Sequence, residues 1–193
     1  MKRIPFSRSI ALGALGSLLL SGPLLFVSGQ AVSSPTGTLG QGLSASANRG
    51  TPIMARTADE AEIRQLTAQW FAAWSPGAER IDWDAMSTLF VQEPGALLVF
   101  DDAGDSMVVL ESWTEYRATW EPFMEQFSEW QIAPEGEIRV IVDGNLATTV
   151  FTLAGGGRDQ AGKAIQFRQW GTHVWQRIDN RWVIVHEHLT TGN

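Results

Sequence analysis

The chain contains no cysteine. This absence excludes disulfide bonds, thiolate nucleophiles and metal sites built from cysteine. Basic residues are also scarce, since 14 lysines and arginines stand against 21 aspartates and glutamates and leave a net charge of −7. An acidic protein is repelled by the phosphates of nucleic acids and of anionic membrane surfaces. We therefore expect neither nucleic acid nor, for the processed chain, a membrane among its partners.

Several motifs that identify enzyme classes are missing as well. The run Gly155-Gly156-Gly157 lacks the lysine and the following helix of a phosphate-binding loop. The sequence shows no dinucleotide-binding glycine fingerprint, no internal repeat and no nucleophile elbow around a serine. We therefore expect no cofactor, and we interpret residues 155–160 as a wide loop.

The N-terminal segment has the pattern of a targeting signal. The first eight residues include three basic ones, and residues 10–27 form an apolar stretch. Gly29-Gln30-Ala31 then offers the small residues that signal peptidase reads. We predict a signal peptide over residues 1–31 and a secreted or periplasmic protein; the alternative is an anchor that stays in the membrane.

The remaining chain divides into a linker and one domain. Residues 32–56 are rich in Ser, Gly, Thr and Ala, which predicts a disordered linker because such a segment buries little apolar surface. Residues 57–193 suit one compact domain with a single core. Thr57 and Glu60 have the spacing of a capping box and predict the start of the first helix.

Hydrophobic periodicity predicts three helices followed by a long antiparallel sheet. The helices are expected over residues 57–74, 82–90 and 112–127, and the strands over residues 96–101, 108–110, 130–132, 138–142, 146–154, 167–178 and 181–190. Helices gathered on one side of an antiparallel sheet make an α+β roll. We therefore predict the α+β class, with the helices packed in a strongly curved antiparallel sheet.

Residues 167–190 have the strongest local pattern, two runs of alternating bulky and polar residues around Asp179-Asn180. Asp and Asn tolerate positive φ, which predicts a two-residue turn at this pair. Regular pairing from that turn places His173 opposite His186 and Gly171 opposite His188. All three histidines would then share one face, while Trp170, Val174, Val183, Val185, Glu187 and Leu189 would lie on the other.

This hairpin resembles that of the nuclear-transport-factor-two-like superfamily, which includes ketosteroid isomerase and the SnoaL-like polyketide cyclases. Its greatest similarity is to the association domain of calcium/calmodulin-dependent kinases, although His173 stands where those domains have an arginine. The resemblance covers residues 57–191 and implies a cone-shaped cavity and a dimer formed through the sheet. The residues that carry it are Thr172-His173-Val174-Trp175, Asp179, Arg181-Trp182, Ile184-Val185-His186, His188 and Thr190.

The resemblance implies that the histidine face lines the cavity and that large aromatic residues complete it. The expected ligand-binding residues are His173, Trp175, Trp70, Trp74, Tyr116 and Trp120. Most of the nine tryptophans would serve as core whatever the function. The apolar second face of the hairpin predicts a homodimer.

The histidines are open to three interpretations. In the first interpretation, the histidines have a purely structural role, and their ring nitrogens form hydrogen bonds with the backbone or with a carboxylate. Alternatively, one of them is a general acid or base beside Asp101, a residue that otherwise starts a turn. In that case His188, His186 and Asp101 are the catalytic candidates. In the third interpretation, His173, His186 and His188 together bind a metal, as three-histidine zinc sites do.

Two functions follow for the domain. The first is an exported domain that binds a small, partly apolar molecule, with isomerase-, cyclase- or dehydratase-like acid/base chemistry if it is an enzyme. The second is a non-catalytic dimerisation or assembly domain.

Overall fold

The computed structural model describes residues 53–102 and 107–191 and confirms the α+β class. The predicted signal peptide and nearly all of the predicted linker lie outside these residues. The elements in chain order are α1 (Ile53–Ala73), α2 (Trp83–Ser87), β1 (Leu98–Asp102), β2 (Met107–Leu110), α3 (Trp113–Met124), β3 (Phe127–Asp143), β4 (Leu146–Asp159), β5 (Ala164–Ile178) and β6 (Arg181–Thr191).

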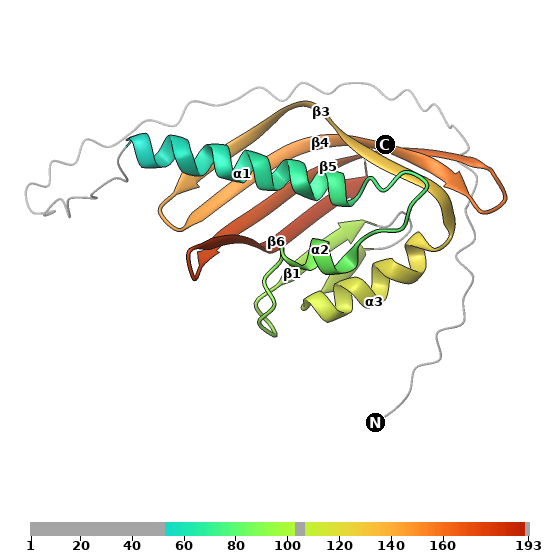
Figure 1. The fold of residues 1–193 in the computed structure, drawn as a ribbon, viewed down its shortest axis with the longest axis horizontal. Coiled ribbons are helices and arrows are strands. Elements are labelled where there is room, and N and C mark those ends of the chain that lie inside the picture. The colour runs from blue at the N-terminus through green and yellow to red at the C-terminus, as the bar shows by residue number, and fades with distance from the viewer. Residues whose placement is uncertain (1–52, 103–106, 192–193) are drawn as a thin grey trace, which may run out of the picture. The chain divides into compact units, whose positions relative to one another are not determined.

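The strands form one curved, six-stranded sheet in the order β2-β1-β6-β5-β4-β3 (Figure 1). All neighbours are antiparallel except β1 and β6, which are parallel. The long helix α1 runs across the inner face of the sheet against β3 and β4, with α2 and α3 on the same side (Figure 1). The inner face is therefore covered by helices, as predicted.

The first helix begins at Ile53, before the predicted start at Thr57, so the last predicted linker residues are helical. Its inner side buries Ile63, Trp70 and Phe71. Just after the helix, the Ser75 hydroxyl donates to the Ile132 carbonyl at 2.7 Å and accepts from the Ile132 amide at 3.0 Å. These bonds fix the end of α1 against β3.

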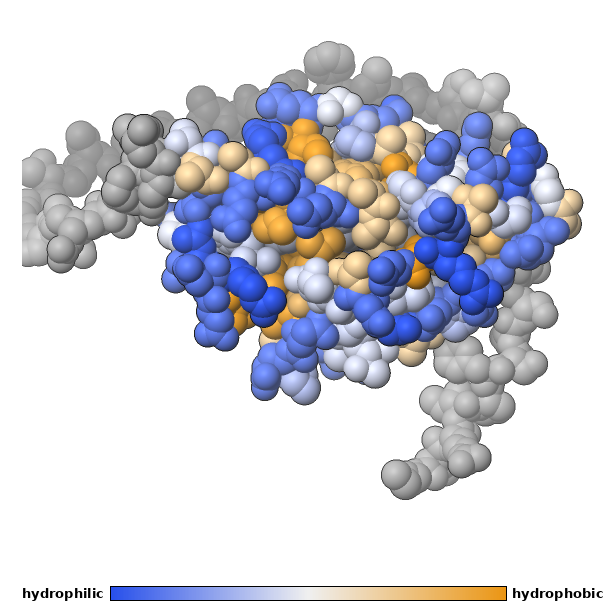
Figure 2. All heavy atoms as spheres, in the orientation of Figure 1, coloured by the Kyte–Doolittle hydropathy of each residue, from blue (hydrophilic) through white to orange (hydrophobic). Residues whose placement is uncertain are grey.

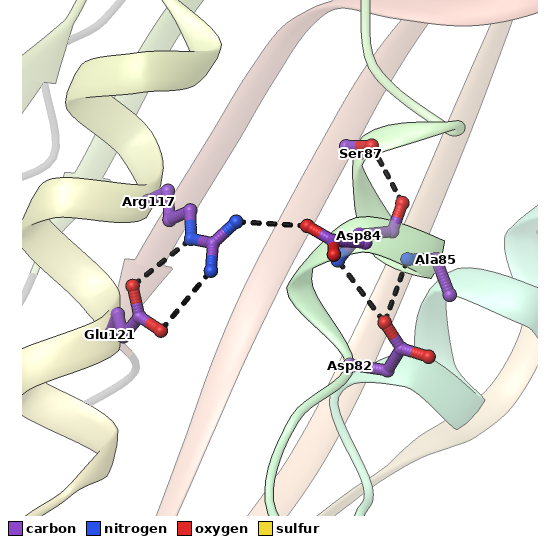
Figure 3. A network of polar contacts seen from close by, with 6 residues as sticks. All are labelled: Asp82, Asp84, Ala85, Ser87, Arg117 and Glu121. Atoms are coloured by element: carbon purple, nitrogen blue, oxygen red, sulfur yellow. Dashed lines mark hydrogen bonds and ion pairs between the residues drawn. The ribbon is translucent and has the colours of Figure 1, made fainter.

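The two short helices are linked by side chains on their exposed sides. The Asp82 carboxylate caps α2 by accepting from two backbone amides at its first turn. Arg117 of α3 donates to Asp84 of α2 at 3.0 Å and to Glu121 of its own helix at 3.0 Å (Figure 3). The second helix ends at Ser87, earlier than predicted, because the backbone of residues 89–91 instead bonds to Ile184 of β6.

The glycine run is a strand, not the predicted loop. Gly155-Gly156-Gly157 belongs to β4, which pairs with β5 along nearly its full length. A side chain at Gly155 would collide with the Phe167 ring, and one at Gly157 would collide with the backbone of Glu129. Glycine is therefore needed here for close approach between strands. The reversal follows at residues 160–163, where Asp159 accepts from the amides of Ala161 and Lys163 at 2.9 Å.

Hydrophobic side chains also remain on the outer face of the sheet. Within the described residues, the strand registers place every exposed large hydrophobic side chain on that face, namely Leu98, Met107, Val109, Ile141, Leu146, Val150 and Trp170. The helix side, seen in Figure 2, shows hydrophobic residues between patches of hydrophilic ones. Within the described residues, no helix is both long and apolar enough to cross a membrane.

Candidate active site in the cone

The hairpin formed by β5 and β6 has the predicted turn. Asp179 and Asn180 adopt φ angles of 48° and 63°, the left-handed values that a two-residue primed turn requires. Next to the turn, Trp175 pairs with Ile184 and Ile178 pairs with Arg181, as regular counting predicts.

A bulge then changes the register. The pairing shifts by one residue between Val174 and Trp175, so His173 faces Glu187 and Gly171 faces Leu189. The predicted pairing of His173 with His186, and of Gly171 with His188, is therefore wrong. Because side chains alternate with a period of two, one extra residue in β6 exchanges the two faces beyond the bulge.

The exchange removes two of the predicted catalytic residues from the cone. His186 and His188 lie on the outer face, and His188 is exposed. The three histidines therefore do not form the metal site that the sequence suggested. No group of three or more His, Asp or Glu side chains in the described part of the chain is arranged to hold a metal ion.

The exchange also alters the predicted dimer face. Trp170 and Val174 lie on the outer face as expected. Leu189 lies on the inner face, and both Leu189 and Val183 are buried within the chain at 6% and 5% exposure. These last two side chains are therefore not available to a partner.

Inside the cone, the bulge brings Glu187 against His173. Both side chains have 0% exposure, and His173 Nε2 lies 3.2 Å from Glu187 Oε2. This spacing is that of an ion pair, although the contact does not meet hydrogen-bond geometry. Trp70 and Phe151 enclose the imidazole, with ring centroids 4.7 and 4.9 Å away. The pair therefore lies in an aromatic environment without direct access to solvent.

Tyr116 of α3 joins the pair from the helix side. Its hydroxyl donates to Glu187 Oε1 at 2.9 Å. Burial, and then the negative charges of Glu187 and Asp101, raise the pKa of Tyr116 well above its usual value. The phenol therefore keeps its proton and remains a hydrogen-bond donor.

Asp101 completes the cluster from β1. It is 7% exposed, and Gln169 Nε2 lies 3.5 Å from its Oδ1 atom. Burial, and then the nearby charges of Glu187 and Asp102, raise the pKa of Asp101 to about 8. The Asp101 carboxyl is thus mostly protonated at neutral pH. Of the predicted catalytic residues, it is the one that the fold places in the cone.

The predicted ligand-binding residues are also brought together, but they fill the interior. The six residues are at most 8% exposed. Trp70 and Trp74 lie 6.5 Å apart between ring centroids, Trp74 and Tyr116 lie 6.2 Å apart, and Tyr116 and Trp120 lie 6.5 Å apart. An open hollow of about 510 Å³ lies elsewhere, between residues 76–83, the end of α3 and the start of β3, and none of the cluster residues lines it.

Glu187 is the residue that sequence reasoning missed. Regular alternation assigned it to the outer face, and nothing in the local pattern marks the extra residue in Val183-Ile184-Val185. The available signal is chemical, since Glu187 stands between two histidines directly after the apolar run of residues 182–185. Such an acidic residue in a central strand is best accommodated beside a buried partner.

Comparison with known proteins agrees with this architecture. The model of a SnoaL-like domain matches residues 63–191. A search of the curated proteins finds no significant match. A nuclear-transport-factor-2-like superfamily protein from Salmonella enterica superposes with a TM-score of 0.62 at 17% identity, covering 71% of this chain and 93% of the other.

Two further solved structures share this fold. A hexachlorocyclohexane dehydrochlorinase, LinA type 2, superposes with a TM-score of 0.61 at 10% identity, covering 74% of this chain and 90% of the other. The association domain of calcium/calmodulin-dependent kinase II from C. elegans superposes with a TM-score of 0.54 at 18% identity, covering 71% and 98%. At these identities the likeness shows the fold only. The family model spans most of the chain, and the protein therefore belongs to the family of SnoaL-like domains.

Proposed function

We propose that this domain binds a small, partly apolar molecule inside the cone and moves a proton on it. The observation that carries the proposal is the buried cluster of Asp101, Tyr116, His173 and Glu187 within an aromatic interior. Burying ionisable groups costs several kcal/mol unless they are paired. A domain that needed only a core would be more stable with apolar side chains here.

The cluster contains both a base and an acid. We assign His173 as the base. Nε2 lies 3.2 Å from Glu187 Oε2, which favours the tautomer with the proton on Nε2, and Nδ1 has no hydrogen-bond partner among the described residues. Glu187 then holds the ring in this tautomer, as the carboxylate does in other carboxylate–histidine pairs. Asp101, protonated at neutral pH because its pKa is about 8, is the acid that returns a proton.

The direction of substrate approach follows from exposure. Asp101 is 7% exposed, whereas Tyr116, His173 and Glu187 are each at 0%. We infer that a molecule approaches from the end where Asp101 and Gln169 lie and displaces aromatic side chains as it enters. The surrounding rings favour a flat or compact apolar body.

The chemistry that fits this set is removal of a proton from carbon followed by isomerisation or elimination. The names of two similar structures agree with elimination, the dehydrochlorinase and a putative dehydratase of this fold from Streptomyces avermitilis. Their low identities, 10% and 16%, mean that they support the class of reaction and not a particular substrate.

Variants of the cluster test the proposal. Small cyclic ketones, alcohols and chlorinated hydrocarbons are first screened for binding by tryptophan fluorescence. Turnover of those that bind, or exchange of their carbon-bound protons in deuterated water, is then followed by nuclear magnetic resonance.

His173→Gln should lower the rate by about 10²- to 10⁴-fold, the usual contribution of a general base. The control is Asp143→Asn, which changes an exposed acidic residue at the end of β3. Equal rates in His173→Gln and wild type would exclude His173 as the base, and a panel without any binder would overturn the proposal.

A second candidate, an assembly domain, is favoured by the outer face. We propose that a second copy of the chain covers the seven exposed hydrophobic residues of that face. Monomers seldom expose so many large apolar side chains on one surface. Sedimentation of wild type and Val150→Lys at micromolar concentration measures this: the wild type should be dimeric and the variant monomeric.

A further inference from the structure

The histidines that the bulge turns outward lie together on the outer face. His186 and His188 are two residues apart on β6 and therefore project from the same side of the sheet. The Phe100 ring of β1 contacts both, with centroids 5.9 Å from His186 and 6.2 Å from His188. The two imidazoles are thus close neighbours on a rigid strand.

One of the two rings is already oriented as metal ligands are. His186 Nδ1 lies 2.8 Å from the Leu98 carbonyl oxygen. A carbonyl only accepts, so Nδ1 carries the proton and the lone pair is on Nε2. A hydrogen bond from one ring nitrogen to a backbone carbonyl is the usual support of an imidazole that binds a metal through the other.

The histidine pair also lies at the centre of the apolar outer face. The exposed hydrophobic residues are on β2 and β1 to one side of β6 and on β5, β4 and β3 to the other. A two-fold contact that covers this whole face has its axis near the middle of the sheet. Residues close to such an axis meet their own copies in the partner.

We propose that two copies of the chain bind one divalent transition-metal ion, zinc being the best fit, through His186 and His188 of each copy. This inference rests on the dimer proposed above. One copy supplies only two ligands, whereas a closed zinc site needs four in a tetrahedral arrangement, and imidazole is a favoured ligand for zinc. Four imidazoles at an apolar contact also need partners for their nitrogens, and a metal ion satisfies four of these at once.

The experiment uses untagged protein, so that no added histidines bind metal. The dimer dissociation constant is measured by sedimentation in EDTA and in zinc chloride, and the zinc stoichiometry by titration calorimetry. Zinc should lower the dissociation constant by about tenfold or more, since an ion that binds only the dimer stabilises it by mass action. One ion should bind per two chains, and cobalt(II) should give the visible absorption of a tetrahedral site.

The matched variants separate the metal site from the dimer. The double variant His186→Asn, His188→Asn should have the same dissociation constant in zinc chloride as in EDTA, and it should lose the cobalt spectrum. Thr148→Ala, on the same face but on β4, should keep the zinc effect and the cobalt spectrum. A dimer that zinc does not strengthen would overturn the metal site and leave the dimer. Zinc bound to monomers at one per chain would also overturn it, and a monomer under every condition would overturn both.

Discussion

At the scale of single residues, the sequence indicated the kind of chemistry but not the full set of participants. Asp101 and His173 were expected near the cavity, and both lie in the buried cluster. His186 and His188 were expected beside them and lie on the opposite face. The difference has a single physical cause. An extra residue in a strand leaves the hydrophobic pattern of the sequence unchanged, but it turns every later side chain of that strand to the opposite face of the sheet.

The raised pKa of Asp101 predicts a pH-dependent stability. The pKa is about 8 in the folded chain and 3.8 without burial, so between these values the folded state holds a proton that the unfolded chain releases. The free energy of unfolding should therefore decrease as pH rises from about 4 to about 8, by up to about 1.4 kcal/mol per pH unit. Asp101→Asn should remove this contribution. Urea unfolding across the range measures it, with Asp143→Asn as control; equal slopes in wild type and Asp101→Asn would contradict the assignment.

At the scale of secondary-structure elements, the sequence predicted which helices and strands exist better than it predicted where they begin and end. Turn chemistry at Asp179-Asn180 was decisive, since few other residue pairs adopt two positive φ angles in succession. The glycine run was misread because clusters of glycine usually mark turns and loops, whereas here β3, β4 and the Phe167 ring approach too closely for a Cβ atom. That approach depends on the neighbouring strands, which local sequence does not describe.

The glycine run gives a prediction for β4. Gly157→Ala should destabilise the domain by about 1–3 kcal/mol, the typical cost of an added methyl group in a close-packed site. The new Cβ atom would meet the backbone of Glu129 and Trp130, which cannot move aside without breaking strand pairing. Gly155→Ala should cost less, because it meets the Phe167 side chain, which can rotate. Urea unfolding gives both values. A larger destabilisation from Gly155→Ala than from Gly157→Ala would show that β3 and β4 are less closely packed at Gly157 than described.

At the scale of the whole molecule, the order of elements was sufficient to predict the architecture. Helices that precede an antiparallel meander have few ways to cover one face of it, and the hairpin motif selected the cone. The parallel pairing of β1 with β6 was not predicted, since it joins segments far apart in the sequence. The filled interior was also not predicted, because periodicity indicates which residues face inward and not how tightly they pack.

The predicted targeting signal concerns the part of the chain outside the described residues, and we propose that the protein is exported and cleaved after Ala31. The basic start, the apolar stretch of residues 10–27 and the small residues at Gly29 and Ala31 motivate this. N-terminal sequencing of the secreted or periplasmic fraction should begin at Val32, and removal of the three basic residues takes the net charge from −7 to −10. Replacing Gly29 and Ala31 with leucine should block cleavage and leave the precursor in the membrane fraction, because signal peptidase accepts only small residues there. Intact Met1 on wild-type protein in the cytoplasm would exclude export, and intact Met1 in the membrane fraction would favour a retained anchor.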